Sequence, residues 1–310
     1  MTITMANITN KFSVIISAYN SSLTLDETLS SVLSQTLLPL EVIVVDDCSI
    51  DSNETYRICE KYRTSLNLKY IRHQINMNGA AARNTGINIS TGDYVCFLDA
   101  DDIWLPNKLA LINTYINHSK SPEKCLFFSQ LYLGQREQPN ETCMVYPKTL
   151  PTSNKLDEYL FVYGGLIQTS TIVCHRILAL DTMFDERFKR HQDYDFIIRL
   201  SQKISTVSMI PHPLVKWVTS QNGRNEISKG ETPEYCQYWI NEMKKYMSSD
   251  AICGYMLYQY TRRAFNKKHY FLLLKIVFHV TLHSSFKFKK IQLIRVLKKY
   301  KNQSNLEINF

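Results

Sequence analysis

The chain has 310 residues, of which 45% are hydrophobic and 21% are charged, a balance that excludes disordered, collagen-like and coiled-coil proteins. Its net charge of +8 is unevenly distributed, because the segment from Arg262 to Lys301 holds 12 of the 36 basic residues and no acidic residue. The remainder has 24 basic and 28 acidic residues, a net charge of −4. Such a basic segment indicates an anionic partner, either nucleic acid or an anionic membrane surface.

The chain shows neither a secretory signal nor a metal-binding cysteine pattern. The first eleven residues lack a basic start followed by an apolar run, and the eight cysteines are scattered without zinc-type spacing. The longest apolar stretch, Tyr270–Leu282, is interrupted by Lys275 and His279 and is shorter than the roughly 20 residues of a membrane span. We therefore expect a cytoplasmic protein with reduced thiols.

The first hundred residues alternate between short apolar runs and helical patterns. We predict strands over Phe12–Ala18, Glu41–Val45, Leu68–Ile71 and Tyr94–Leu98, with helices over Leu25–Gln35, around Tyr56–Tyr62 and over Ala80–Ile89. Continuous apolar strands alternating with helices are typical of a mostly parallel sheet covered on both faces. The sequence thus predicts an α/β fold with a doubly wound sheet.

The pattern is mixed after residue 104 and becomes helical from about residue 232. We predict a helix over Pro106–Asn117, short strands over Leu126–Ser129, Thr171–Cys174 and Val207–Ile210, and a helix over Asp193–Leu200. The simplest division is one α/β domain with halves 1–103 and 104–225, followed by a helical, basic C-terminal region, 226–310.

Acidic residues follow two of the predicted strands. Asp46 and Asp47 end one strand, and Asp99, Asp101 and Asp102 end another. The carboxyl ends of parallel strands meet at one edge of a sheet, where ligands bind. Clustered carboxylates repel one another unless a cation intervenes, and Mg²⁺ or Mn²⁺ held by one or two carboxylates usually bridges to a phosphate. The alternative is that these aspartates cap helices and turns, which we favour for Asp102.

Five segments together carry a resemblance to a known family. They are VIISAYN (14–20), VIVVDDCSID (42–51), GAAARNTGI (79–87), GDYVCFLDADD (92–102) and QDYDFIIRL (192–200). In this order and spacing they resemble the family 2 inverting glycosyltransferases, which have the GT-A fold, over about two thirds of the chain. The resemblance implies metal-dependent transfer of a sugar from a nucleotide donor, with 1–103 binding the nucleotide-sugar and 104–225 the acceptor.

The same resemblance implies roles for individual residues. Asp101 of a DXD motif would bind Mn²⁺ or Mg²⁺, and Asp193 would be the catalytic base that activates the acceptor hydroxyl. The residues implied in binding the UDP-sugar donor are Ala18, Tyr19, Glu27, Asp47, Arg83 and Asp99.

One position departs from the family pattern. Asp193 follows Gln192 where the family has glutamate, which puts in doubt any contact made by that glutamate. The alternative role for Asp193 is a helix N-terminal acid stabilised by the dipole, with Asp195 pairing to Arg199 four residues on. Trp104 could stack on a sugar or belong to the core.

The C-terminal region bears on the acceptor. Leu293, Val296, Leu297 and Tyr300 form one apolar helical face beside basic residues, and Tyr270–His283 predicts a second apolar-rich helix with Phe271, Leu274 and Phe278. These helices would either lie in the interface of an anionic membrane or pack on the core. We do not expect nucleic acid as a partner, because no recognition module accompanies the charge. By resemblance to O-antigen and capsule enzymes, we expect a hexose, glucose or galactose, to pass from UDP to a polyprenyl-diphosphate-linked acceptor such as GlcNAc-diphospho-undecaprenol, at the inner face of the bacterial cell membrane.

Two other functions remain open at this point. A glycoside hydrolase using two of these carboxylates would need neither nucleotide nor metal. A catalytically silent nucleotide-sugar-binding scaffold protein would need no base.

Overall fold

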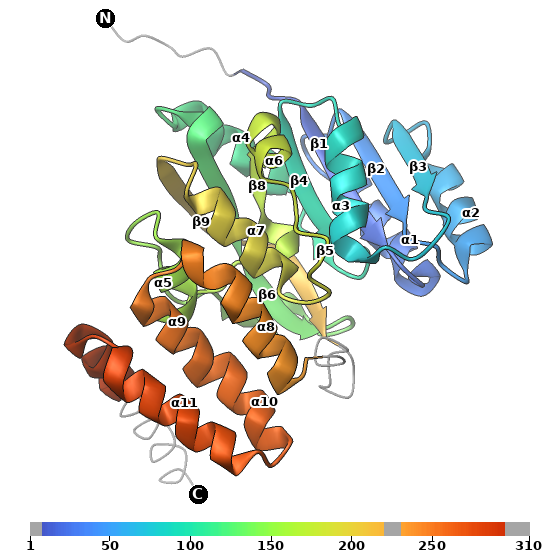
Figure 1. Cartoon of the computed structure of the whole chain (residues 1–310). Coiled ribbons are helices and arrows are strands. Elements are labelled where there is room, and N and C mark those ends of the chain that lie inside the picture. The colour runs from blue at the N-terminus through green and yellow to red at the C-terminus, as the bar shows by residue number, and fades with distance from the viewer. Residues whose placement is uncertain (1–7, 220–230, 295–310) are drawn as a thin grey trace, which may run out of the picture. The chain divides into compact units, whose positions relative to one another are not determined.

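The computed structural model describes residues 8–219 and 231–294. The chain divides into two compact units (Figure 1). Residues up to 154 and from 166 to 219 belong to the first unit, and residues 155–165 join the segment from 231 onward in the second. The second unit therefore takes one short piece from the middle of the chain.

A single mixed sheet forms the first unit. Among the described residues its strand order is β3-β2-β1-β4-β8-β6-β9-β5, with β7 paired to β6. The strands are β1 (Phe12–Ala18), β2 (Glu41–Asp46), β3 (Leu68–Arg72), β4 (Tyr94–Asp99), β5 (Ile103–Trp104), β6 (Cys125–Gln135), β7 (Met144–Tyr146), β8 (Val173–His175) and β9 (Thr206–Thr219). Strands β1 to β4 pair in parallel, as do β6 and β9, whereas β8 is antiparallel to its neighbours. The predicted doubly wound, mostly parallel sheet is confirmed.

Helices cover both faces of this sheet. They are α1 (Ser22–Leu33), α2 (Ser52–Tyr62), α3 (Asn78–Ile89), α4 (Lys108–His118), α6 (Arg176–Thr182) and α7 (Gln192–Ser201). Side chains of β1 alternate between the faces: Val14 and Ile16 pack in one core cluster with α1, α2 and α4, whereas Ile15 contacts α3. That second contact is close, because a Cβ added at Gly86 of α3 would lie 2.3 Å from Cγ2 of Ile15. Glycine is thus required for α3 to approach the sheet.

A buried carboxylate joins the segments at the amino ends of the strands. Glu41 of β2 accepts hydrogen bonds from Ser13 Oγ (2.6 Å), from Thr91 N (2.6 Å) and Thr91 Oγ1 (2.8 Å), and from Lys69 Nζ (2.6 Å). Burial would raise the pKa of Glu41, but these bonds, that of Lys69 foremost, lower it from 4.5 to about 2. Glu41 therefore holds β1, β3 and the turn before β4 in register.

The structure extends the predicted elements at several places. β9 runs to Thr219 although the prediction ended at Ile210, and it accommodates Pro211 and Pro213 beside a register shift at Gln130. The short strands β5 and β7 carry too few residues to show a pattern. β6 likewise runs to Gln135 although the prediction ended at Ser129. The other predicted strands and helices of this unit are present, with ends that differ by a few residues.

The second unit is helical, as predicted for the C-terminal region. Its α-helices are α5 (Leu156–Phe161), α8 (Pro233–Met243), α9 (Ser249–Tyr255), α10 (Thr261–Asn266) and α11 (Tyr270–His283), and a further helical segment is described over 286–294. Phe161 and Trp239 both pack on Tyr255. The predicted apolar face at Val296, Leu297 and Tyr300 lies outside the described residues. Within 8–219 and 231–294, none of the helices has the length and hydropathy needed to cross a bilayer.

Candidate active site

The predicted site residues lie where the parallel strands end. In the register of the sheet, Ala18 of β1 is opposite Asp46 of β2, and Ser17 is opposite Asp99 of β4. The last residues of these strands therefore lie side by side at one edge, as the sequence pattern predicted. The side chains at this edge differ in how many hydrogen bonds they make within the protein.

Asp47 organises the loop that leads into α3. Its carboxylate accepts hydrogen bonds from the backbone N–H groups of Met77 (2.8 Å) and Asn78 (2.7 Å), and lies 2.8 Å from His73 Nδ1. Its own N–H donates to the carbonyl of Ala18 (2.9 Å). The contact of Asp47 with the UDP-sugar donor stays a prediction, and this side chain also holds the loop in place.

Asp99 is fixed from two sides. Arg83 of α3 donates to Oδ1 of Asp99 from Nη2 (2.6 Å), and Gln168 donates to Oδ2 from Nε2 (3.2 Å). The N–H of Asp99 donates to Ser170 Oγ (2.9 Å). Arg83 is 9% exposed, and its Nη1 donates to Oε1 of Gln192 (2.9 Å). One guanidinium thus links the end of β4 to the start of α7.

Gln192 joins neighbouring segments at the position where the sequence departs from the family pattern. Its Nε2 donates to Asn78 Oδ1 (3.1 Å) and to the carbonyl of Phe188 (2.8 Å), while its amide oxygen accepts from Arg83. A neutral side chain here joins α3 to α7 without adding negative charge beside Asp193.

Two other acids at this edge accept hydrogen bonds that stabilise the fold. Asp46 accepts from Ser49 N (2.9 Å) and from the hydroxyl of Tyr70 (2.6 Å). Asp102 is 1% exposed and accepts from Ser170 Oγ (2.6 Å), Gln168 Nε2 (2.8 Å) and Val218 N (3.1 Å). Burial, and then the charges of Asp101 and Asp99, raise the pKa of Asp102. The structural role predicted for Asp102 agrees with these contacts.

Asp101 has its side chain on the accessible side of the same turn. Crowding by protein atoms, and after it the charge of Asp99, raises the pKa of Asp101 to about 6, while Arg136 and Arg83 oppose the shift. Arg136 follows β6, donates to the carbonyl of Asp101 (2.9 Å) and forms an ion pair with Glu27 of α1. Glu27 thus lies beside the Asp101 turn and is paired with an arginine, and its contact with the donor stays a prediction.

Asp193 lies in the first turn of α7. The surrounding protein raises the pKa of its half-buried carboxyl, and the charge of Asp99 adds to the rise. Against these act the N–H of Tyr194, which donates to Oδ1 (2.9 Å), and the positive charges of His191 and Arg83. Asp195, two residues on, is buried and paired with Arg199, as predicted. The two acids of α7 therefore have different roles.

The remaining predictions at this edge concern the end of β1 and a tryptophan. Ala18 is buried and contributes its carbonyl to Asp47, whereas the Tyr19 side chain is 52% exposed just beyond the strand. Trp104 is 2% exposed and donates from Nε1 to the carbonyl of Ser170 (3.0 Å). Trp104 therefore belongs to the core and does not face a sugar.

Among the described aspartates of this edge, Asp101 and Asp193 keep a carboxylate with at most one hydrogen bond, and neither carboxylate forms an ion pair as that of Glu27 does. Asp101 is an accessible carboxylate beside that of Asp99. Such a site suits a hard divalent cation that takes its other oxygen ligands from a diphosphate. No cluster of three or more His, Cys, Asp or Glu side chains that could hold a metal ion occurs in residues 8–219 and 231–294. A cation here would therefore depend on ligands from the bound donor.

Sequence reasoning missed three residues of this edge, namely His73, Arg136 and Gln168. Gln168 begins the 3₁₀ turn Thr169–Thr171, and Arg136 lies in a hairpin; neither belongs to a periodic pattern. His73 lies between β3 and α3 and bridges Asp47 to Thr85 Oγ1 (2.9 Å from Nε2). A polar residue placed just after a predicted strand was the one available signal for His73.

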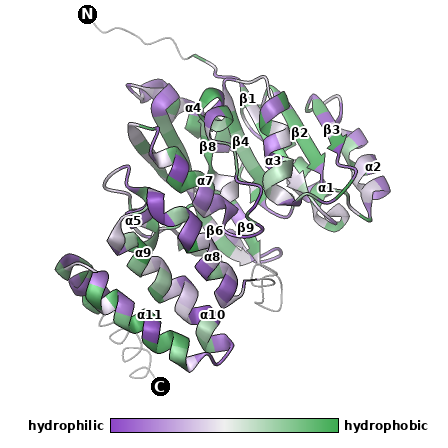
Figure 2. Ribbon diagram, viewed as in Figure 1, coloured by the Kyte–Doolittle hydropathy of each residue, from purple (hydrophilic) through white to green (hydrophobic). Residues whose placement is uncertain are grey.

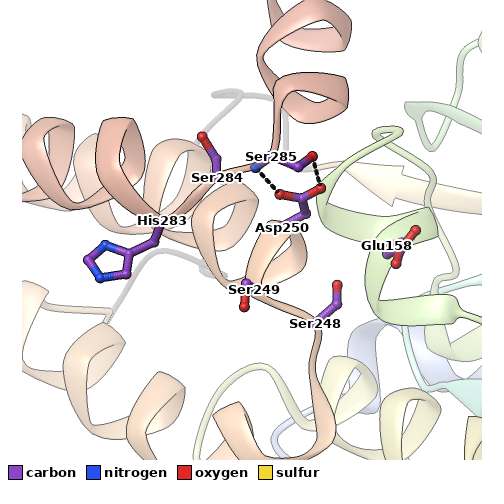
Figure 3. A pocket seen from close by; sticks show the side chains of 7 residues that line it. All are labelled: Glu158, Ser248, Ser249, Asp250, His283, Ser284 and Ser285. Carbon is purple, nitrogen blue, oxygen red and sulfur yellow. Dashed lines mark hydrogen bonds between the residues drawn. The ribbon is translucent and has the colours of Figure 1, made fainter.

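The second unit contains an open pocket of about 330 Å³ that none of these residues lines (Figure 3). It is lined by Glu158, Ser248, Ser249, Asp250, His283, Ser284 and Ser285. Asp250 accepts from Ser285 N (2.7 Å) and from the Ser285 hydroxyl, and Ser285 Oγ accepts from Phe288 N (3.0 Å). These polar groups cap the helical segment 286–294, so we assign the pocket a structural role.

Comparisons with known proteins place this geometry in context. Residues 13–121 match the family described as glycosyl transferase family 2. The amylovoran biosynthesis glycosyltransferase AmsB of Erwinia amylovora is 36% identical over 253 residues, which cover 80% of this chain and 82% of AmsB. The poly(ribitol-phosphate) beta-N-acetylglucosaminyltransferase TarS of Staphylococcus aureus is 29% identical over 231 residues, 72% of this chain and 38% of TarS.

Solved structures share the fold. The structure of Staphylococcus aureus TarS 1–349 in complex with UDP-GlcNAc aligns with a TM-score of 0.60 at 23% identity, covering 83% of this chain and 73% of that one. A complex of the same TarS fragment with UDP aligns with a TM-score of 0.55.

Proposed function

The chain belongs to glycosyltransferase family 2, and from that membership we propose that it transfers a hexose, glucose or galactose, from a UDP-sugar to a lipid-linked saccharide. The acceptor in this proposal is a sugar on a polyprenyl diphosphate, such as GlcNAc-diphospho-undecaprenol, in the assembly of an O-antigen or related polysaccharide. The transfer is a single displacement with inversion, assisted by Mn²⁺ or Mg²⁺.

One observation carries the proposal: the fold engages the carboxylates of Asp46, Asp47, Asp99 and Asp102, but leaves those of Asp101 and Asp193 available. An inverting transfer needs two such groups, one on the side of the leaving diphosphate and one on the side of the attacking hydroxyl. The raised pKa of Asp193 also makes this carboxylate a stronger base than an ordinary aspartate.

On the donor side, the chain's own residues orient the nucleotide-sugar. Tyr19 and the Asp47 loop would contact the nucleoside, and Asp99, held by Arg83 and Gln168, would accept hydrogen bonds from the donor ribose or sugar. Asp101 would hold the cation, which supplies positive charge to the diphosphate as the glycosidic bond breaks. Because Asp99 is held before the donor arrives, little reorganisation is needed on binding.

On the acceptor side, Asp193 would take the proton of the attacking hydroxyl. Arg83 joins Gln192 at the start of α7 to Asp99 at the donor edge, and this link would position Asp193 relative to the donor. The oxygen of the acceptor then bonds to the anomeric carbon from the face opposite the diphosphate, which leaves as UDP.

The names of relatives support the class of product. AmsB is named for amylovoran biosynthesis, and the putative glycosyl transferase WcaA of Escherichia coli, 30% identical over 178 residues, for colanic acid biosynthesis. UDP and UDP-GlcNAc complexes of TarS support a UDP donor, and they make UDP-GlcNAc the principal competitor to the hexoses proposed here. An anionic membrane surface at the cytoplasmic face of the cell membrane is the setting we propose for the lipid-linked acceptor.

Thermal unfolding with UDP tests the donor site first. We expect UDP to raise the melting temperature only when Mn²⁺ or Mg²⁺ is present. In the variant Asp101→Asn, adding the metal should no longer change the effect of UDP on the melting temperature. Stabilisation by neither nucleotide nor metal would instead favour a hydrolase.

A donor screen then tests the reaction. UDP-glucose, UDP-galactose and their N-acetyl forms are offered with a synthetic GlcNAc-diphosphate-lipid, and the linkage of the product is determined. Transfer from UDP-glucose or UDP-galactose is expected. Transfer from UDP-GlcNAc alone would refute the hexose assignment, and UDP binding without transfer from any donor would favour a silent scaffold.

A further inference from the structure

Helix α11 presents an apolar face to solvent. Tyr270, Phe271, Leu274, Val277, Phe278 and Leu282 are each between 52% and 71% exposed. At 100° per residue these six side chains fall on one side of the helix. Figure 2 shows α11 coloured as hydrophobic over much of its length. A contiguous apolar surface of this kind marks a site of association.

The opposite side of α11 is the side that packs within its own unit. Ile276 is 1% exposed, and Val280 packs against a core cluster of Val162, Cys253 and Phe288. The helical segment after α11 is fixed through Asp250 and Ser285. The buried side of α11 therefore sets the orientation of the helix, and the exposed apolar face takes no part in that packing.

Basic side chains flank the apolar face. Lys275 lies on α11 itself, with Nζ 4.6 Å from the ring centre of Phe271. The exposed lysines on either side of α11 are Lys267, Lys268, Lys287, Lys289 and Lys290. The sequence contains no acidic residue from Arg262 to Lys301. Acids of other elements lie near two of these lysines, namely Glu234 near Lys267 and Asp250 near Lys287. The charge that α11 and its flanking segments carry themselves is of one sign, which complements an anionic surface and disfavours contact with a second copy of the same face.

We infer that the exposed face of α11 inserts into the interfacial layer of an anionic lipid bilayer, with the flanking lysines contacting the headgroups. Apolar side chains on one side and lysines at the rim are the two features of an interfacial helix. The inference rests on the proposed function, since a lipid-linked acceptor is held at such a surface. Of the two apolar helices predicted from the sequence, it assigns membrane contact to Tyr270–His283.

Vesicle co-sedimentation of the full chain tests the inference. We expect retention by phosphatidylcholine vesicles containing one-third phosphatidylglycerol, and weaker retention by phosphatidylcholine alone or at high salt. The variant Phe271→Ser/Leu274→Ser/Phe278→Ser should bind the anionic vesicles about 100-fold more weakly, because it removes three apolar side chains. These positions are exposed, so the variant should fold.

A matched control removes as many exposed apolar side chains elsewhere. Leu38→Ser/Leu150→Ser/Ile177→Ser changes residues that are 50%, 59% and 66% exposed in the first unit, and it should bind vesicles as the parent does. As a depth measurement, Phe278→Trp should be quenched by lipids brominated in their acyl chains, whereas Ile177→Trp should not.

Failure of this inference is distinguishable from failure of the proposed function. UDP stabilisation in the presence of Mn²⁺, measured on the same proteins, should be unchanged by the α11 substitutions. If UDP stabilises the protein but anionic vesicles do not retain it, or retain the α11 variant equally, the membrane inference is wrong and the proposed function stands. A parent dimer that the α11 variant converts to monomer, without vesicle binding, would also overturn it.

Discussion

Replacing Asp193 with asparagine should lower activity and raise stability at the same time. Asparagine keeps the Oδ1 that accepts from the N–H of Tyr194 (2.9 Å) but cannot take a proton from the acceptor. Loss of a general base costs about 10²- to 10⁴-fold in rate, equivalent to roughly 3–5 kcal/mol in the activation free energy. UDP binding should be unchanged.

The stability change follows from the sign of the pKa shift. The folded protein raises the pKa of Asp193 above its ordinary value, so the ionised carboxylate destabilises the fold at neutral pH and ceases to do so under acidic conditions. The asparagine side chain carries no charge, and we therefore expect the variant to have a higher melting temperature than the parent near neutral pH, with the difference vanishing at low pH. In the parent, the transfer rate should fall as pH drops below the raised pKa.

Initial rates of UDP release and calorimetric melting temperatures measure the two effects. Asp195→Asn is the matched control, because Asp195 is buried and paired with Arg199 and its loss should lower the melting temperature. A rate for Asp193→Asn within tenfold of the parent, or a lowered melting temperature near neutral pH, would refute the reasoning.

Three further substitutions test the same edge and the opposite one. Gln192→Glu places a negative charge beside Asp193 and should move the acidic limb of the pH–rate profile to higher pH; an unchanged limb would contradict the electrostatic account of Asp193. Arg136→Gln removes a charge that lowers the pKa of Asp101, so half-saturation by Mn²⁺ should need severalfold more metal at a pH near 6 but little more at alkaline pH; equal effects at both would exclude this role. Glu41→Gln removes a carboxylate whose pKa falls from 4.5 to about 2 on folding. That difference corresponds to at most about 3 kcal/mol of unfolding free energy at neutral pH, an upper limit because Lys69 is half exposed. In urea titrations the deficit of the Gln variant should shrink as pH falls through 4.5 toward 2, and a deficit that persists at the acidic end would mean that packing, not ionisation, is responsible.

The sequence predicted those elements of the fold that show a clear local pattern of apolar and polar residues. β1, β2 and β4 are short runs of buried apolar residues, and each is followed by polar residues that end it. β9 escaped prediction beyond Ile210 because Pro211 and Pro213 interrupt the pattern, yet its pairing with β6 tolerates them beside a register shift. Residues 155–165 belong to the second unit because of contacts between segments far apart in sequence, and no local sequence pattern predicts such contacts.

The candidate site divides in the same way. Asp101 could be singled out because it follows a strand with a clear pattern, and Asp193 because it begins a helix with one; both also lie in segments that resemble the family. Gln168 and Arg136 act through contacts with Asp99 and with the carbonyl of Asp101, and their own neighbours in sequence are irregular. Asp47 shows a further limit, since the residue predicted to contact the donor also organises the loop before α3, and the sequence gives no sign of that second role.

The Glu41 cluster has a consequence for how this chain can change over time. At the amino ends of the strands, the Glu41 carboxylate accepts hydrogen bonds from Ser13, Lys69 and Thr91 and contributes stability. At the carboxyl ends, the raised pKa values of Asp101 and Asp193 indicate that the charges of these two acids lower the stability of the fold. Replacing Asp101 or Asp193 would remove a destabilising charge but, by their proposed roles, also the activity. Substitutions that alter the choice of sugar must therefore keep both acids and draw on the stability that the amino ends supply. Divergence in specificity should accumulate at one end of the strands while the other end is held constant.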